Sequence, residues 1–140
     1  MISTLSSRII ATVSACAIIL LIPACTSDAD KFDNLTECGN LRFPDAVELV
    51  SYHEKLVGHD QVLVAVVDMS ADQVAEFKQR SELVRFKPGV PISWLEQWDG
   101  ADVLKSEAGN EHLVDPNPWL RVAIHDSGGQ SRRVFLSLAC

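Results

Sequence analysis

The run at residues 61–69 constrains the fold more than any other part of the chain. Its sequence, QVLVAVVDM, is rich in β-branched residues and places apolar side chains on both faces of a strand. Such a strand is stable only inside a sheet whose two sides are both covered. This run therefore predicts a central, covered strand, around which the rest of the domain is arranged.

Three more strands are predicted from hydrophobic patterning. Apolar and polar residues alternate with the period of a strand at residues 46–54, 119–126 and 133–139. Glycine-containing turns at residues 58–60 and 127–130 indicate that the strands are joined in pairs as hairpins.

A helix is predicted over residues 71–84, where Ser70 and Gln73 have the spacing of a capping box. Val74, Phe77 and Val84 mark its buried stripe. Residues 92–98 fit one or two helical turns, and residues 100–118 follow no clear pattern. The order strand, strand, helix, irregular segment, strand, strand predicts an α+β fold. We expect a four-stranded antiparallel sheet with one main helix packed on one face.

The N-terminus predicts export from the cytoplasm. Arg8 precedes an apolar run at residues 9–22 that only Thr12 and Ser14 interrupt. The run fits a signal-peptide core and is shorter than the roughly 20 residues that span a bilayer. An ordinary signal peptide and an uncleaved anchor helix are the alternatives to a lipoprotein signal.

The segment Ile22-Pro23-Ala24-Cys25 resembles the lipobox of bacterial lipoproteins. The resemblance implies cleavage before Cys25 and attachment of a diacylglyceryl group to that cysteine. Cys16 has a similar context, but cleavage there would leave an apolar core of only five residues, at 9–13. Two acyl chains give a stable membrane anchor, whereas a single chain binds marginally. We therefore predict a signal peptide at 1–24, an acidic flexible tether at 25–37 and a single domain at 38–140.

Two of the four cysteines remain for a disulfide in the mature chain. Cys16 leaves with the signal peptide and Cys25 takes the lipid, so Cys38 and Cys140 are expected to pair in an oxidising compartment. The chain-entropy model gives about 4.7 kcal/mol for a loop of roughly 100 residues. The alternatives are two free thiols or an intermolecular bond through Cys140.

The charge of the mature chain argues against nucleic-acid binding. Loss of Arg8 with the signal changes the formal charge from −7 to −8. An acidic domain is also a poor candidate for electrostatic binding to anionic lipid headgroups.

Four further segments are similar to small uncharacterised envelope lipoproteins of actinobacteria. The resemblance covers most of the mature chain and implies a lipid-anchored envelope domain, without any catalytic or binding residue. The segments are Phe43-Pro44-Asp45-Ala46, Ser81-Glu82-Leu83, Pro88-Gly89-Val90-Pro91 with Trp94 and Trp98, and Val134-Phe135-Leu136.

No catalytic or metal-binding motif is present in the sequence. The four histidines do not follow a metal-ligand spacing, and no Gly-x-Ser-x-Gly occurs. His125 and Asp126 are adjacent, so on a strand they point to opposite faces. Asp68 and the pair Glu111-His112 are the remaining candidates. We therefore expect a non-enzymatic domain without cofactor or metal.

The tryptophans are the best candidates for a binding surface. Trp94 and Trp98 are four residues apart and share a helical face, and Trp119 follows two prolines. They either cap the open face of the sheet or form a patch for a partner or ligand.

We therefore expect an envelope lipoprotein on the extracytoplasmic face of the membrane that binds a protein or ligand. The alternatives are a small extracytoplasmic enzyme with a histidine and a carboxylate in residues 100–126, and an envelope spacer.

Overall fold

The structure is a computed structural model that describes residues 26–114 and 117–140. The predicted signal peptide at 1–24 and the lipobox cysteine Cys25 lie outside the described residues. None of the helices in the described part is both long enough and apolar enough to cross a membrane.

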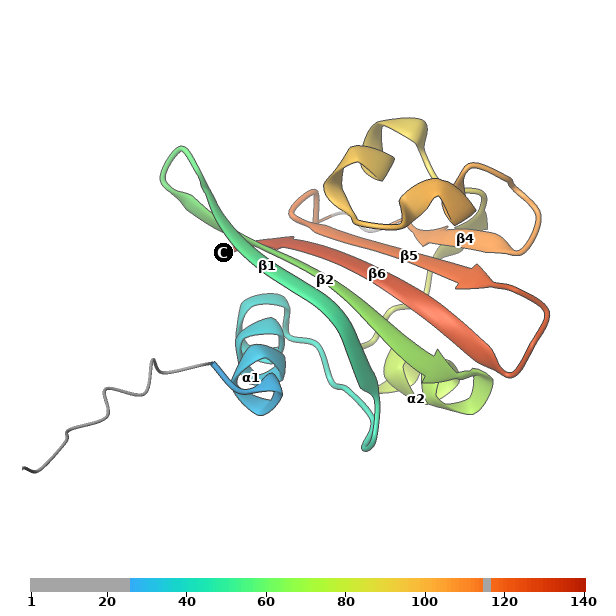
Figure 1. Cartoon of the computed structure of the whole chain (residues 1–140), viewed down its shortest axis with the longest axis horizontal. Coiled ribbons are helices and arrows are strands. Elements are labelled where there is room, and N and C mark those ends of the chain that lie inside the picture. The colour runs from blue at the N-terminus through green and yellow to red at the C-terminus, as the bar shows by residue number, and fades with distance from the viewer. Residues whose placement is uncertain (1–25, 115–116) are drawn as a thin grey trace, which may run out of the picture.

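The core of the domain is a six-stranded antiparallel sheet with the order β1-β2-β6-β5-β4-β3 (Figure 1). The α+β class is confirmed, but the expectation of four strands is wrong. One of the two additional strands, at residues 110–113, lies in the region without a clear sequence pattern, and the other, at residues 86–88, follows the predicted helix; they are four and three residues long. The strands are β1 (Glu48–Val57), β2 (Asp60–Ser70), β3 (Phe86–Pro88), β4 (Asn110–Leu113), β5 (Leu120–Asp126) and β6 (Ser131–Ala139).

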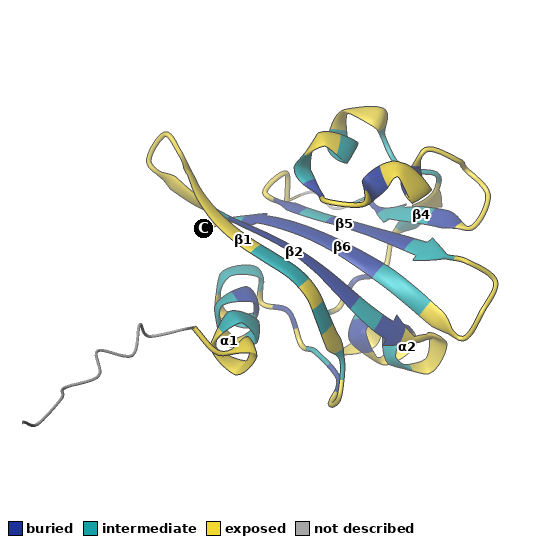
Figure 2. Ribbon diagram, in the orientation of Figure 1, coloured by how far each residue is buried: buried dark blue, intermediate teal, exposed yellow. Residues whose placement is uncertain are grey.

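The central position predicted for residues 61–69 is confirmed. β2 lies between β1 and β6, and its residues 63–67 are all buried. Val66 is paired with Phe135 and Ala65 with Leu136 across the β2–β6 register. Figure 2 shows that burial is concentrated in β2, β6 and β5.

Helices cover both faces of the sheet. On one face, which we call the helical face, lie α1 (Asp28–Gly39) and α2 (Ala71–Arg80). On the other face lie two short 3₁₀ helices, η1 (Ile92–Gln97) and η2 (Ala101–Leu104), at the top of Figure 1. We call it the 3₁₀ face. The single main helix of the sequence prediction is α2, and it packs on only one of these faces.

The α2 helix begins as predicted and ends earlier. The Ser70 hydroxyl accepts a hydrogen bond from the Gln73 backbone N–H at 3.1 Å, and the Gln73 side chain accepts one from the Ser70 N–H at 2.8 Å. The helix ends at Arg80 rather than residue 84, because the chain turns there and Glu82 adopts a φ of 56°. Val84, expected on the buried stripe, is 84% exposed.

The predicted flexible tether at 25–37 is wrong for residues 28–37, which belong to α1. Ser27 and Asp30 form a capping box at the start of this helix. Leu35 is fully buried, and the Phe32 ring packs edge-on against Phe43 with centroids 5.0 Å apart. A helix with two apolar residues at i and i+3 can dock on a sheet despite its acidic outer face.

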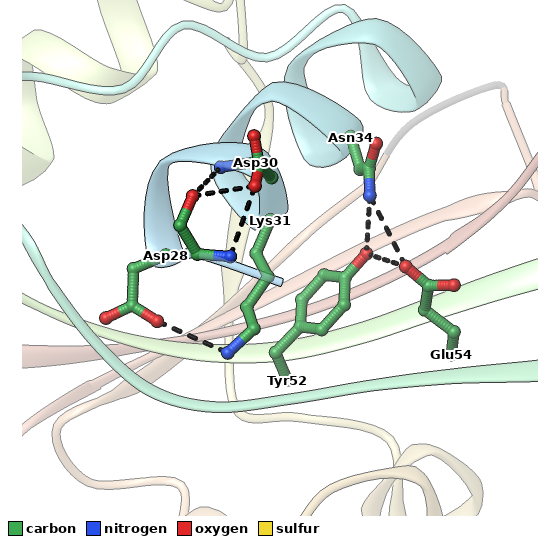
Figure 3. Close-up of polar contacts among 7 residues, drawn as sticks. Asp28, Asp30, Lys31, Asn34, Tyr52 and Glu54 are labelled. Carbon is green, nitrogen blue, oxygen red and sulfur yellow. Dashed lines mark hydrogen bonds and ion pairs between the residues drawn. The ribbon is translucent and has the colours of Figure 1, made fainter. Parts of the chain in front are cut away.

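Polar contacts also fasten α1 to β1 (Figure 3). The Asn34 amide donates to the Tyr52 hydroxyl at 3.3 Å and to Glu54 at 3.3 Å. The Tyr52 hydroxyl donates to the Glu54 carboxylate at 2.6 Å. Burial and this hydrogen bond raise the pKa of Tyr52 to about 12.

The predicted disulfide is present between Cys38 and Cys140, whose Cα atoms are 5.5 Å apart. It joins the last turn of α1 to the residue that follows β6. A side chain at Gly39 would collide with Leu138, so the helix end lies very close to β6. The disulfide therefore closes a part of the domain that is already tightly packed.

Candidate ligand-binding groove

An open groove lies on the helical face of the sheet. It has a volume of about 570 Å³. It forms because α2 packs on β2 and β6, whereas β3, β4 and β5 continue beyond the helix. Its lining comes from the start of α2, from β3, from the segment before β4, and from the facing side chains of β4, β5 and β6.

The floor of the groove is apolar. Val74 of α2 is 7% exposed and Ile124 of β5 is 3% exposed, and both also belong to the core of the helical face. Phe86 and Pro88 of β3 form part of the outer wall. A ligand in the groove would therefore bury an apolar surface of its own.

Side-chain charges pair at the β3–β4 edge of the groove. The Lys78 ammonium of α2 forms an ion pair with the Glu111 carboxylate of β4. The same ammonium lies 4.1 Å from the centroid of the Phe86 ring, which is a cation–π contact. These contacts join α2 to the edge strands without closing the space between them.

A second ion pair contributes to the lining from the β5–β6 hairpin. The Arg132 guanidinium lies 3.2 Å from the Asp126 carboxylate, which also accepts a hydrogen bond from the Gly128 N–H at 2.7 Å. The backbone of Gly109 bonds the same hairpin, since its carbonyl accepts from the Asp126 N–H at 2.7 Å. Gly109 has a φ of 72°, and a Cβ there would collide with the Asp126 carbonyl, so the position requires glycine.

The three tryptophans that the sequence offered as a binding patch do not form one surface. Trp98 is 5% exposed, and its ring is tilted against that of Phe135 with centroids 5.6 Å apart. Its indole N–H donates to the Leu136 carbonyl at 2.8 Å. Trp94 is half-buried with its ring centroid 6.4 Å from that of Trp98, so the two rings cover the 3₁₀ face of the sheet. Trp119 is 61% exposed, and among the described residues no ring contact joins it to the other two.

Three of the four histidines have polar partners, and none of the four lines the groove. His53 lies 2.9 Å from the Asp99 carboxylate, and both side chains are well exposed. The Nδ1 atom of His112 lies 2.6 Å from the Gly89 carbonyl, and that of His125 lies 2.7 Å from the Asn110 amide oxygen. Among the residues described, no group of three or more His, Cys, Asp and Glu is placed to hold a metal ion.

The other catalytic candidates from the sequence also bond to different partners and do not form one site. His125 bonds Asn110 whereas Asp126 bonds Arg132, so the two adjacent residues serve different neighbours. Glu111 pairs with Lys78 in the groove, while His112 packs edge-on against Trp94 with centroids 5.3 Å apart. Asp68 binds Arg133 of β6 through both carboxylate oxygens.

Comparison with protein-family models, with curated proteins and with solved structures finds no match to this chain.

Sequence reasoning missed the groove itself. Val74, Glu111 and Asp126 come from three separate elements, and nothing in their local patterns indicates that they share one pocket. The one usable signal was Gly109, because a glycine before a short polar segment is typical of a turn with positive φ.

Proposed function

We propose that this chain is a lipid-anchored domain on the extracytoplasmic face of a membrane, and that it binds a small amphipathic molecule in the groove. Two observations support the location. The lipobox-like segment ends at Cys25, and a disulfide between Cys38 and Cys140 suits an oxidising compartment.

The binding proposal depends on one observation, an apolar floor bordered by ion pairs in a groove of about 570 Å³. Pockets for small molecules are typically about 300–1,000 Å³ and combine apolar walls with a few polar groups. The floor of Val74 and Ile124 suits an apolar body, and the charged side chains at the rim suit polar substituents on it.

Binding is favoured over the alternative of an enzyme with a histidine and a carboxylate in residues 100–126. The groove contains three carboxylates of that region, Glu107, Glu111 and Asp126, but its described lining includes no histidine, cysteine or serine. His112 and His125 are not among the lining residues, and their Nδ1 atoms face the Gly89 carbonyl and the Asn110 amide oxygen. A proton-transfer pair would need both kinds of side chain in one pocket.

A pair of substitutions on α2 tests the groove. Ala71 is exposed and lines the groove, so Ala71→Trp would fill it without altering the core. Ala75 is exposed on the same helix and does not line the groove, so Ala75→Trp is a matched control. The probe is anilinonaphthalene sulfonate, which has an apolar body and one charge, and its affinity is measured by fluorescence titration.

We expect Ala71→Trp to weaken probe binding at least tenfold and Ala75→Trp to leave it within twofold. Equal affinities in the two variants, or no saturable binding to the unsubstituted chain, would refute the groove as a ligand site.

The anchor is tested separately by the intact mass of the protein extracted from membranes. We expect a chain that begins at residue 25 and is heavier by a diacylglyceryl or triacyl group, and we expect Cys25→Ser to abolish this mass. An unmodified chain, cleaved elsewhere or uncleaved, would remove the anchor while leaving the groove proposal intact.

A further inference from the structure

A row of polar side chains crosses the 3₁₀ face of the sheet, on the side opposite the groove floor. Its members are directly opposite one another in the strand registers, so their side chains lie on the same face. We call this set the polar row, and it consists of Glu48, Asp68, Arg133, His125 and Asn110, on five successive strands of the sheet.

The hydrogen bonds of Asn110 define the protonation of His125. Asn110 is 4% exposed, and its amide nitrogen donates to the Val103 carbonyl at 2.8 Å and to the Ser106 carbonyl. The oxygen of the amide therefore faces the Nδ1 atom of His125, at 2.7 Å, and accepts a hydrogen bond from it. In the neutral imidazole the proton is then on Nδ1, and Nε2 has a free lone pair.

Arg133 is fixed in a similar way by its neighbour on β2. Its Nε and Nη2 atoms donate to the two oxygens of Asp68, at 2.8 and 2.9 Å. The hydrogen bonds to the Asp68 carboxylate stabilise the charged guanidinium and raise the pKa of Arg133, and the opposite charges of the two side chains compensate each other. The Nη1 atom makes no hydrogen bond with any residue that the structure describes, so its donors remain available.

Three members of the polar row, Asp68, Arg133 and His125, line a pocket of about 320 Å³. The hydroxyls of Ser127 and Ser131 line it as well, and Val103 of η2 adds an apolar wall. The pocket thus combines an acceptor at His125 Nε2, donors at Arg133 Nη1, and two hydroxyls that act as either.

The charges of the row distinguish between classes of ligand. Asp68 already compensates Arg133, and Glu48 lies close enough to add to the negative potential at the guanidinium. A free anion would therefore meet two carboxylates and one guanidinium that is already paired. A neutral ligand avoids this repulsion and still uses every donor and acceptor.

We propose that this pocket binds a neutral, hydroxyl-rich ligand such as a sugar ring through a vicinal diol. One hydroxyl donates to His125 Nε2, and an oxygen of the diol accepts from Arg133 Nη1, with Ser131 and Ser127 completing the contacts. Val103 faces the C–H surface of the ring. The site lies on the other face of the sheet from the groove, so it does not depend on the function proposed above.

The first test is the protonation state of His125 in the full chain, labelled with ¹⁵N and held in detergent micelles. Long-range proton–nitrogen spectra separate the two neutral tautomers of each histidine. We expect neutral His125 to be protonated on Nδ1. A neutral form protonated on Nε2 would overturn the proposal, because no acceptor would face the ligand.

The second test is a titration of the same sample with D-glucose, with tetrahydropyran as the ring without hydroxyls, and with inorganic phosphate as the anion. We expect glucose to give saturable shifts of the His125 and Arg133 side-chain signals, and the other two probes to bind at least tenfold more weakly. Phosphate binding more tightly than glucose, or the absence of glucose-induced shifts at these two residues, would refute the proposal.

Variants localise the effect. His125→Asn places an amide nitrogen at the position of Nδ1, where it can still donate to Asn110, and has no atom at the position of Nε2, so it should weaken glucose binding at least tenfold. His59→Asn, in the exposed turn between β1 and β2, is the matched control and should leave glucose binding unchanged. Ser131→Ala leaves the polar row intact and should weaken binding a few-fold. Unchanged affinity in both His125→Asn and Ser131→Ala would place glucose elsewhere.

Discussion

The α1 end and the groove end of the helical face are built in different ways. At the α1 end, a fully buried leucine and a disulfide hold the helix directly on the sheet. At the groove end, α2 reaches the edge strands through the partly exposed pair Lys78 and Glu111, with open space beneath. Close apolar packing leaves no room for a ligand, whereas charged contacts across a gap create a pocket. We therefore expect substitutions at the first end to cost stability and those at the second to cost binding.

Removal of the disulfide should have the largest effect on stability. The bond closes a separation of 102 residues in sequence. Simultaneous Cys38→Ser and Cys140→Ser substitution should lower the free energy of unfolding by about 4 kcal/mol. Urea unfolding followed by circular dichroism measures the difference. A decrease in the free energy of unfolding below about 1 kcal/mol would mean that the packing of α1 is sufficient, without the disulfide, to hold this end of the domain together.

Leu35→Ala should have the next largest effect, because this side chain is fully buried between α1 and the sheet. We expect a loss of about 3 kcal/mol. The control is Val84→Ala, at a position 84% exposed, which should change stability by no more than about 0.5 kcal/mol. If the two variants unfold at the same urea concentration, α1 is not packed as described and residues 28–37 act as a tether after all.

At the groove end, Lys78→Met should reduce stability by about 1 kcal/mol or less. The ion pair is partly solvated, with side-chain exposures of 26% for Lys78 and 35% for Glu111. The same substitution should weaken probe binding several-fold, because it changes the charge at the groove rim. A loss of stability as large as that of Leu35→Ala would remove the contrast between the two ends.

The smallest expected effect on stability comes from the ionisation of Tyr52, which contacts α1 at the first of the two ends. Its pKa is raised to about 12 from 10.0, so the folded chain retains the phenol proton where the unfolded chain loses it. The contribution of this group to the free energy of unfolding is fully present below pH 10 and is lost as pH rises through 12. Because this is the only tyrosine in the chain, absorbance at 295 nm reports its ionisation alone.

Tyr52→Phe should remove this component of the pH dependence between pH 10 and 12. A midpoint of the absorbance change near 10 in the folded protein would show that the Asn34–Tyr52–Glu54 contacts do not hold α1 to β1.

Much of the fold was predictable because its strongest patterns are local. The β-branched run of β2, the capping box of α2 and the glycine turns of both hairpins are each encoded within a few residues. The pairing of Cys38 with Cys140 followed from eliminating the other two cysteines. The missed elements have weak local signals: α1 has only Phe32 and Leu35 as apolar anchors among acidic residues, and β3 contains a proline and three residues in all.

The sites were harder to predict for a different reason. The groove exists where α2 stops short of the sheet edge, and the polar row exists through the register of five strands. Neither the length of a gap nor a register appears in the local pattern of Glu111, His125 or Arg133. The tryptophans illustrate the same limit, since spacing placed Trp94 and Trp98 together but could not show that Trp98 is buried beneath η1 and η2.

The start of α1 also determines how far a lipid-anchored form of this chain could reach. The helix cap is Ser27, so only Thr26 separates it from Cys25. At about 3.6 Å per extended residue, such a link would hold the first helical turn within roughly 10 Å of the lipid headgroups. The domain would then have a restricted orientation and its acidic first turn would face the bilayer. Any partner of such a molecule would have to approach it at the membrane surface rather than at a distance.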